Sequence, residues 1–165
     1  MKPRVTWNWI AQLVTVLIGA YLLKRHYSTA SADDLRWILA PTTVLVELIS
    51  GTSFEFESHA GYLSSNRSFL IAKSCAGVNF LLTAFLMLAV SRLWRDRSQN
   101  MPWKFIPTAA LIAYLATLIA NTVRITVAVQ TQQIQIESGW LPLAQLHRLE
   151  GIFIYFGFLL LLFVI

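Results

Sequence analysis

Residues 74–93 read SCAGVNFLLTAFLMLAVSRL, and from position 76 onward only four polar residues interrupt an apolar run: Asn79, Thr83, Ser91 and Arg92. About 20 helical residues are needed to cross a bilayer core of roughly 30 Å. The length and composition of this run therefore predict a transmembrane helix over residues 76–93. The only cysteine of the chain, Cys75, lies directly before it.

The composition of the whole chain agrees with a membrane environment. Apolar residues make up 56% of the 165 residues, charged residues only 13%, and the mean hydropathy is +0.60. A soluble domain of this length does not need so much apolar surface. We therefore expect an all-α polytopic membrane protein that forms a single integral membrane domain over residues 1–165. About five transmembrane helices are predicted, over residues 7–23, 35–49, 76–93, 105–129 and 149–165.

The orientation follows from the basic residues of the short connections, which are enriched on the cytoplasmic side of membrane proteins. The connection after the third segment contains Arg92, Arg95, Arg97 and Lys104, whereas residues 130–145 contain no Lys or Arg. The first connection is predicted to be cytoplasmic and the second external. The start of 76–93, the end of 105–129 and the start of 149–165 then all lie at the outer face.

The segment 35–49 leaves alternatives open because it is short and contains Pro41 and Glu47. It is a short span, a tilted span or an interfacial helix. If it spans, the connection with Lys24 and Arg25 is cytoplasmic and the amino terminus is external, despite Lys2 and Arg4. If it lies in the interface, the amino terminus is cytoplasmic and this conflict disappears.

The external loop 52–74 has the pattern of a short β-hairpin. Residues 54–57 read FEFE and alternate with period two, Gly61 and Asn66 favour turns, and 68–72 form a second β-prone run. This segment is either an interfacial loop without a binding role or an edge that captures an extended peptide by strand addition.

The lone cysteine excludes an intramolecular disulfide and a dithiol redox cycle. It leaves a structural thiol, an intermolecular bond or a nucleophile. At a helix amino terminus, Cys75 meets the positive end of the peptide dipoles, which favours the thiolate. Ser74 is suited to cap that helix, and Gly77 lets a backbone or a substrate approach closely.

Two later segments carry the other reactive side chains. Asn121 and Arg124 are spaced i, i+3 and share a helix face, where they can stabilise an oxyanion or orient a carbonyl. His147 can exchange protons near neutral pH, Glu150 can orient the imidazole, and Gly151 permits helix contact. Alternatively, Arg124 and His147 are interfacial anchors with no chemical role.

The ordered set Ser74-Cys75-Ala76-Gly77, Asn121-Thr122-Val123-Arg124, and His147 with Gly151 resembles the exosortase and archaeosortase family, and the small size is similar to the compact exosortase K type. The chain departs from the family by its shortness and by Ala76, where serine is common.

The resemblance implies a cysteine protease or transpeptidase (a hydrolase acting in protein sorting) in the cytoplasmic membrane of a prokaryote, with its active site facing outward. Cys75, Arg124 and His147 would be catalytic. The substrate would be a membrane-anchored protein with a carboxy-terminal sorting signal: a short motif, a transmembrane helix and a basic cluster.

Two rival interpretations remain, a non-catalytic membrane assembly subunit and a lipid-phosphate enzyme that uses Arg124 and His147. The sequence has no metal cluster, phosphate-cradling glycine loop or nucleotide motif. We therefore expect no metal and no cofactor, a lipid bilayer as the surroundings and no nucleic acid as partner.

Overall fold

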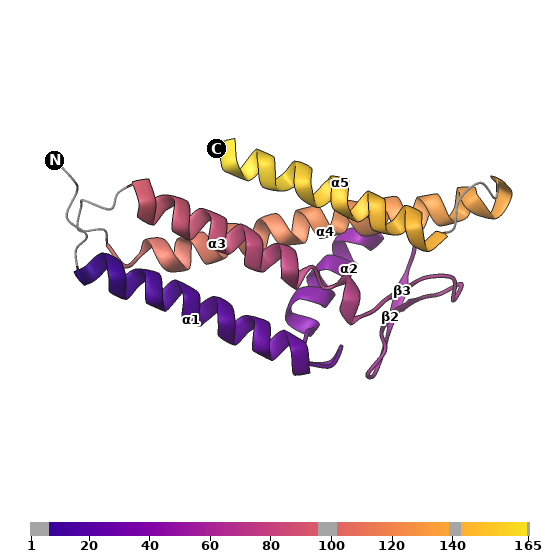
Figure 1. The fold of residues 1–165 in the computed structure, drawn as a ribbon. Helices are drawn as coiled ribbons and strands as arrows, with labels where there is room; N and C mark the ends of the chain where they lie inside the picture. Colours follow the sequence, from indigo (N-terminus) through magenta and orange to yellow (C-terminus); the bar gives the residue numbers. More distant parts are fainter. Residues whose placement is uncertain (1–6, 96–101, 139–142, 165) are drawn as a thin grey trace. The chain divides into compact units, whose positions relative to one another are not determined.

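The computed structural model describes residues 7–95, 102–138 and 143–164, without the side chains of 132–138 and 143–148. The described chain is mostly helical, as predicted. In chain order its elements are α1 (Trp7–Thr29), α2 (Arg36–Ser50), β1 (Phe54–Glu57), β2 (Gly61–Ser64), β3 (Leu70–Ile71), the 3-10 turn η1 (Lys73–Cys75), α3 (Val78–Arg95), α4 (Phe105–Ser138) and α5 (Leu143–Val164) (Figure 1).

Among the described residues, two helical stretches are long and apolar enough to cross a membrane, Lys73–Arg95 and Phe105–Thr131. A third apolar stretch, Leu149–Val164, is shorter. Helix α2 has 15 residues and is therefore ~22 Å long at ~1.5 Å per residue, less than a bilayer core of roughly 30 Å. The predicted count of five spans is not confirmed.

The contacts of the chain group into two compact units, 1–29, 78–117 and 162–165 in the first and 30–77 with 118–161 in the second. In the first unit α1 packs antiparallel to α3. The Trp9 indole N–H donates to the Leu93 carbonyl oxygen at 2.8 Å, and at the other end the Lys24 ammonium donates to Asn79 Oδ1 at 2.7 Å. The chain therefore leaves α1 and enters α3 at the same end of this helix pair.

The opposite end of the same pair holds the connection to α4. The Trp103 indole N–H donates to Asn8 Oδ1 at 3.1 Å, which fixes the start of α1 beside the residues that precede α4. Between the two ends lies a small apolar core of Val16, Ala89, Leu93 and Ala109. The first unit is thus held by apolar packing in the middle and by polar contacts at its ends.

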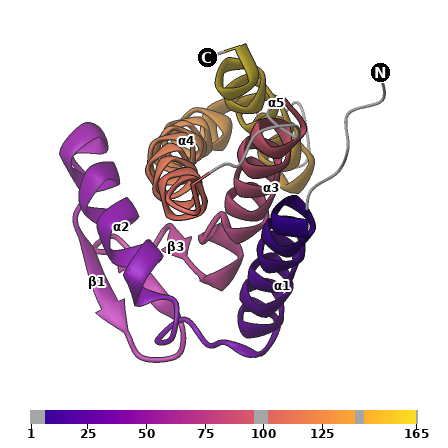
Figure 2. The ribbon, with the colours of Figure 1, turned by 90° about the vertical axis from the view of Figure 1, so that its left-hand side faces the viewer.

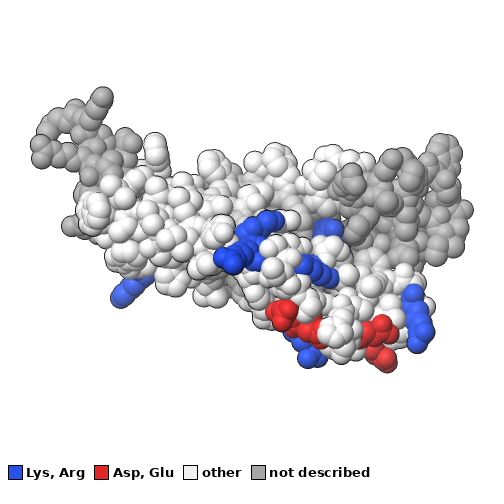
Figure 3. Space-filling view, turned by 60° about the horizontal axis from the view of Figure 1, so that its bottom comes forward, with Lys and Arg blue, Asp and Glu red and all other residues white. Residues whose placement is uncertain are grey.

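Large apolar side chains are exposed along several helices. They include Ile10, Val14, Leu17 and Ile18 of α1, Leu111, Ile112, Leu115 and Ile119 of α4, and Phe153, Phe156, Leu160 and Leu161 of α5. Uncharged residues predominate on the face in Figure 3, where the acidic residues lie near one another and the basic residues are spread along the face. Many exposed large apolar side chains on neighbouring turns of a helix mark contact with a partner or a membrane.

In the second unit, α2 packs against the small sheet (Figure 2). One side of α2 buries Ile38, Leu39 and Val46. Gly51 ends the helix in the left-handed conformation, at φ 69°, which glycine adopts without strain. The Glu47 carboxylate accepts the Phe54 backbone N–H at 2.6 Å and so joins the end of α2 to the start of β1.

The structure confirms β-structure in both predicted runs, but these runs do not pair with each other, because β2 lies between them and begins at Gly61, which was predicted to favour a turn. The strand order is β1-β2-β3, both pairs are antiparallel, and Phe54 faces Ser64 while Tyr62 faces Ile71. Asn66 lies in the turn between β2 and β3, where its Oδ1 accepts the Ser68 backbone N–H at 3.1 Å. Along β1, partly buried Phe and exposed Glu alternate, as the FEFE pattern predicts.

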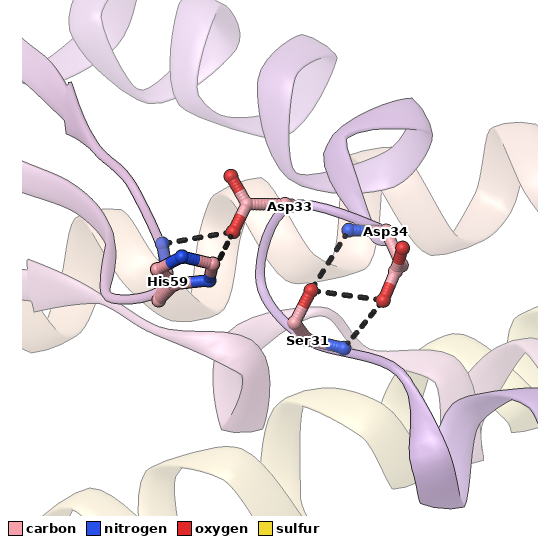
Figure 4. A network of polar contacts seen from close by, with 4 residues as sticks. All are labelled: Ser31, Asp33, Asp34 and His59. Atoms are coloured by element: carbon pink, nitrogen blue, oxygen red, sulfur yellow. Dashed lines mark hydrogen bonds and ion pairs between the residues drawn. The ribbon is translucent and has the colours of Figure 1, made fainter.

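The link between α1 and α2 is tied to the turn of the hairpin (Figure 4). Asp33 Oδ2 accepts the His59 backbone N–H at 2.8 Å and lies 3.0 Å from the imidazole Nδ1. Ser31 and Asp34 close the same loop, because Asp34 Oδ2 accepts the Ser31 backbone N–H at 2.8 Å. This network is on the surface and contains none of the predicted catalytic residues.

Candidate active site

Cys75 lies at the end of the 3-10 turn η1, directly after the sheet. Its backbone N–H donates to the Ala72 carbonyl oxygen at 2.8 Å, and the Ala76 N–H donates to the Lys73 carbonyl oxygen at 3.0 Å. Gly77 follows with φ 68°, a left-handed conformation that favours glycine. The turn keeps Cys75 almost completely buried, with 6% of its surface exposed.

Two sequence predictions at this turn are wrong. Helix α3 begins at Val78 rather than at residue 76, because the left-handed Gly77 interrupts the helical backbone. Ser74 therefore lies inside η1, too far upstream to be the cap of α3, and it is exposed. Gly77 shapes the bend of the backbone between η1 and α3.

Asn121 reaches the Cys75 turn from α4. Its side chain is fully buried, and its Nδ2 donates to the Cys75 carbonyl oxygen at 2.5 Å. A buried carbonyl needs a hydrogen-bond partner, and Asn121 supplies one from a residue 46 positions later in the chain. The predicted motifs around Cys75 and Asn121 therefore meet within the second unit.

Tyr155 of α5 extends this contact to Arg124. The Tyr155 hydroxyl donates to Asn121 Oδ1 at 2.8 Å and accepts from Arg124 Nη1 at 3.2 Å. The Arg124 guanidinium carbon lies 5.4 Å from the centre of the Tyr155 ring. One tyrosine thus contacts both residues of the Asn-x-x-Arg motif, which share a helix face as predicted.

The direction of each hydrogen bond in this chain is fixed by chemistry. Arg124 has only donors, and the Cys75 carbonyl is only an acceptor. The Tyr155 hydroxyl must therefore accept from Arg124 and donate to Asn121, whose amide then donates to Cys75. Hydrogen bonds aligned head to tail polarise one another, which strengthens the chain as a whole. We call Arg124, Tyr155, Asn121 and the Cys75 carbonyl the polar relay.

Gly151, which belongs to the third sequence motif (His147 with Gly151), lies beside Arg124 of the polar relay. A Cβ atom at this position would lie 2.9 Å from Arg124 Nε and 3.5 Å from Arg124 Cδ. Glycine leaves room for the Arg124 side chain in its present position, and a larger residue would require that side chain to shift. Gly151 was predicted to permit helix contact, and the neighbour found within 4 Å of its Cβ position is the Arg124 side chain.

The predicted ends of two helices were wrong near the site. Helix α4 continues to Ser138 rather than residue 129, so Arg124 lies well inside it. Helix α5 begins at Leu143 rather than 149, which puts His147 in its second turn instead of at its start. Residues 130–138 are polar but contain good helix formers such as Gln and Glu, so the helix outlasts the apolar run.

His147 itself lies in α5, one turn before Gly151, and its side chain is outside the described part of the structure. Glu150 is described and is partly buried beside Gly151. Within the described residues, no group of three or more His, Cys, Asp and Glu could hold a metal ion.

Tyr155 is the site residue that the sequence reasoning missed. Its signal was present in the sequence, because Tyr155 carries the only polar side chain in residues 151–164 and lies four residues after Gly151, on the same helix face. A buried tyrosine hydroxyl needs a polar partner, and such a partner could have been sought among Asn121 and Arg124.

No protein-family model matches this chain, and neither a curated protein nor a solved structure is significantly similar to it.

Proposed function

We propose that this chain is a membrane-embedded cysteine protease or transpeptidase of the exosortase and archaeosortase type, with Cys75 as its nucleophile. One observation supports the proposal above all others. The Cys75 turn, the Asn121–Arg124 pair and Gly151 come from three separate sequence motifs, yet the polar relay joins the first two and Gly151 packs against Arg124 of that relay.

The proposed reaction is acyl transfer. The Cys75 thiolate attacks the scissile carbonyl carbon of a membrane-anchored substrate, and His147 takes the thiol proton. The peptide C–N bond breaks, His147 returns the proton to the leaving amine, and the carbonyl remains on sulfur as a thioester. Water, an amine or a glycolipid then attacks the thioester and restores the thiol. The carboxy-terminal tail of the substrate is the leaving group.

The contacts of Asn121 and Arg124 argue for different roles in this reaction. Asn121 donates to the Cys75 carbonyl and accepts from Tyr155, so its amide serves to fix the nucleophile turn. Arg124 carries a permanent positive charge with several donors. The oxyanion that develops on the substrate is therefore assigned to the Arg124 guanidinium.

The arrangement of α1 and α3 supports a revised membrane topology with four crossings, by α1, α3, α4 and α5. The chain leaves α1 and enters α3 at the same end of the pair, so if both helices span the membrane, residues 30–77 cross it an even number of times. Apart from the short turn η1, α2 is the only helix between them. Helix α2 and the sheet would then stay on the outer side with Cys75.

This topology also removes the charge conflict at the amino terminus. Asn8 contacts Trp103, so the start of α1 lies at the same end as Lys104 and the last turn of α3, which contains Arg92. All of these residues are then cytoplasmic, in agreement with the enrichment of basic residues on that side. The exposed apolar side chains of α1, α4 and α5 would face lipid.

The proposal is tested with the full chain co-produced with exported reporters that end in candidate sorting signals, each with a short motif, an apolar helix and a basic cluster. A reporter cleaved by the parent is the assay substrate. Cys75→Ser should abolish its cleavage, because a hydroxyl is a much weaker nucleophile. Ser74→Ala, a change at the exposed neighbouring residue, should preserve it. Cleavage that survives Cys75→Ser would rule out the thiol mechanism and favour chemistry on a lipid phosphate or another enzyme.

A further inference from the structure

We propose that Tyr155 is a positioning residue, which holds the Cys75 turn closed through Asn121 and thereby sets the orientation of the nucleophile. This inference rests on the proposed function for its catalytic meaning. The structural part of the inference, that Tyr155 holds the Cys75 turn through Asn121, does not rest on the proposed function, because it follows from contacts among described residues. Tyr155 is 3.2 Å from Arg124 and 2.8 Å from Asn121, and Asn121 in turn holds the Cys75 carbonyl.

The argument begins with the freedom of an asparagine side chain. Without a hydrogen-bond partner for Oδ1, the Asn121 amide can rotate, and its Nδ2 no longer points steadily at the Cys75 carbonyl oxygen. The Tyr155 hydroxyl removes this freedom by donating to Oδ1. It can donate in that direction because Arg124 N–H occupies the oxygen from the other side. Because Arg124 always donates to the Tyr155 hydroxyl, that hydroxyl always donates to Asn121 Oδ1, and the Asn121 side chain keeps one orientation.

The next step concerns the Cys75 turn. With 6% of its surface exposed, Cys75 must be uncovered by a local opening before a bulky reagent can reach its sulfur. The hydrogen bond from Asn121 opposes that opening. Loss of the Tyr155 hydroxyl should therefore increase reaction of the thiol with a general reagent, while the poorer orientation of the thiol slows cleavage of a substrate. The two effects have opposite signs.

The experiment measures alkylation of the full chain by iodoacetamide in detergent micelles. Cys75 is the only cysteine, so every alkylated molecule reports on this site. Tyr155→Phe should raise the alkylation rate about tenfold, the ratio expected for one lost hydrogen bond. The matched control is Tyr21→Phe, the same change at an exposed residue of α1, which should leave the rate unchanged. Alkylation in denaturant normalises the intrinsic reactivity of the thiol.

A second comparison distinguishes positioning from general loosening of the fold. If Tyr155 acts through Asn121, the double variant Tyr155→Phe with Asn121→Ala should be alkylated no faster than Asn121→Ala alone. Rates that multiply, or a Tyr155→Phe rate equal to that of the parent, would overturn the inference. In the cleavage assay Tyr155→Phe should lower kcat with little change in KM. Failure of Cys75→Ser to stop cleavage would instead refute the proposed function and leave the alkylation result intact.

Discussion

Asn121 donates its side-chain amide to the carbonyl oxygen of Cys75 at 2.5 Å, which ties the middle of α4 to the turn before α3. Both residues are buried. A buried carbonyl that loses its hydrogen-bond partner destabilises the fold by its full desolvation free energy, because no water replaces that partner. This contact is therefore structural and, under the proposed mechanism, also determines where the Cys75 thiol lies.

The first prediction concerns the stability that this contact provides. Asn121→Ala should lower the free energy of unfolding by about 1 to 3 kcal/mol, because it leaves the Cys75 carbonyl and the Tyr155 hydroxyl without this partner. Val123→Ala, an exposed change two residues away on α4, is the control and should cost about 0.5 kcal/mol or less. Thermal unfolding of both variants in the same detergent measures the difference, and equal stability would contradict the role given to Asn121.

The second prediction concerns the space beside Arg124. Gly151→Ala would place a methyl group 2.9 Å from Arg124 Nε and should push the guanidinium away from Tyr155. We expect at least about a tenfold loss of cleavage, equivalent to about 1.4 kcal/mol of transition-state stabilisation. Gly157→Ala is the matched control, since no atom lies within 4 Å of a Cβ there.

Alanine at position 157 should be neutral or should stabilise α5 by up to about 1 kcal/mol, the difference in helix propensity. If Gly151→Ala and Gly157→Ala cleave the reporter equally well, the contact between Gly151 and Arg124 has no catalytic consequence.

The sequence allowed the helices to be located with some accuracy because an apolar run leaves a strong signal. The bounds of α1, α2 and α3 differ from the predicted ones by six residues or fewer at each end. The continuation of α4 beyond residue 129 was missed because helix ends were equated with the ends of apolar runs. In α4 the polar residues 130–138 remain helical through their own propensity.

The site was predictable only in part. Cys75, Asn121, Arg124 and Gly151 stand out because polar and small residues interrupt apolar segments. The hydrogen bonds that connect them depend on which helix faces meet, and no local pattern encodes this. Tyr155 illustrates the limit, since its partners are 31 and 34 positions away.

The third prediction concerns the sheet that precedes Cys75. At Gly61, with φ 125°, a Cβ atom would overlap the Ile71 carbonyl oxygen of β3. Gly61→Ala should therefore disrupt the β2–β3 pairing and destabilise the second unit by about 3 kcal/mol or more, as steric strain on a fixed backbone does. Gly51→Ala tests the same substitution where φ is 69° and the space is open.

Gly51→Ala should cost only about 1 to 2 kcal/mol, the penalty for a side chain in the left-handed conformation. Hydrogen exchange of the β2 amides separates the two cases, because only Gly61→Ala should remove their protection. Equal protection in both variants would show that the close approach at Gly61 is not needed.

The fourth prediction distinguishes four membrane crossings from five. In a Cys75→Ala background, Ser28→Cys lies in the last turn of α1 and Trp94→Cys lies at the end of α3, both at exposed positions. A membrane-impermeant maleimide added to intact cells should label Ser28→Cys and leave Trp94→Cys unlabelled until the cells are opened. Protection of both positions would support the five-span topology, in which α2 crosses the membrane.

The most direct test of the central claim is to look for the thioester on Cys75. Membranes containing the full chain and a cleaved reporter are quenched in acid, and the peptide that carries Cys75 is analysed by mass spectrometry. We predict an adduct whose mass equals the acyl portion of the reporter and which hydroxylamine removes. An unmodified Cys75 peptide throughout turnover, together with undiminished cleavage by Cys75→Ser, would contradict the account.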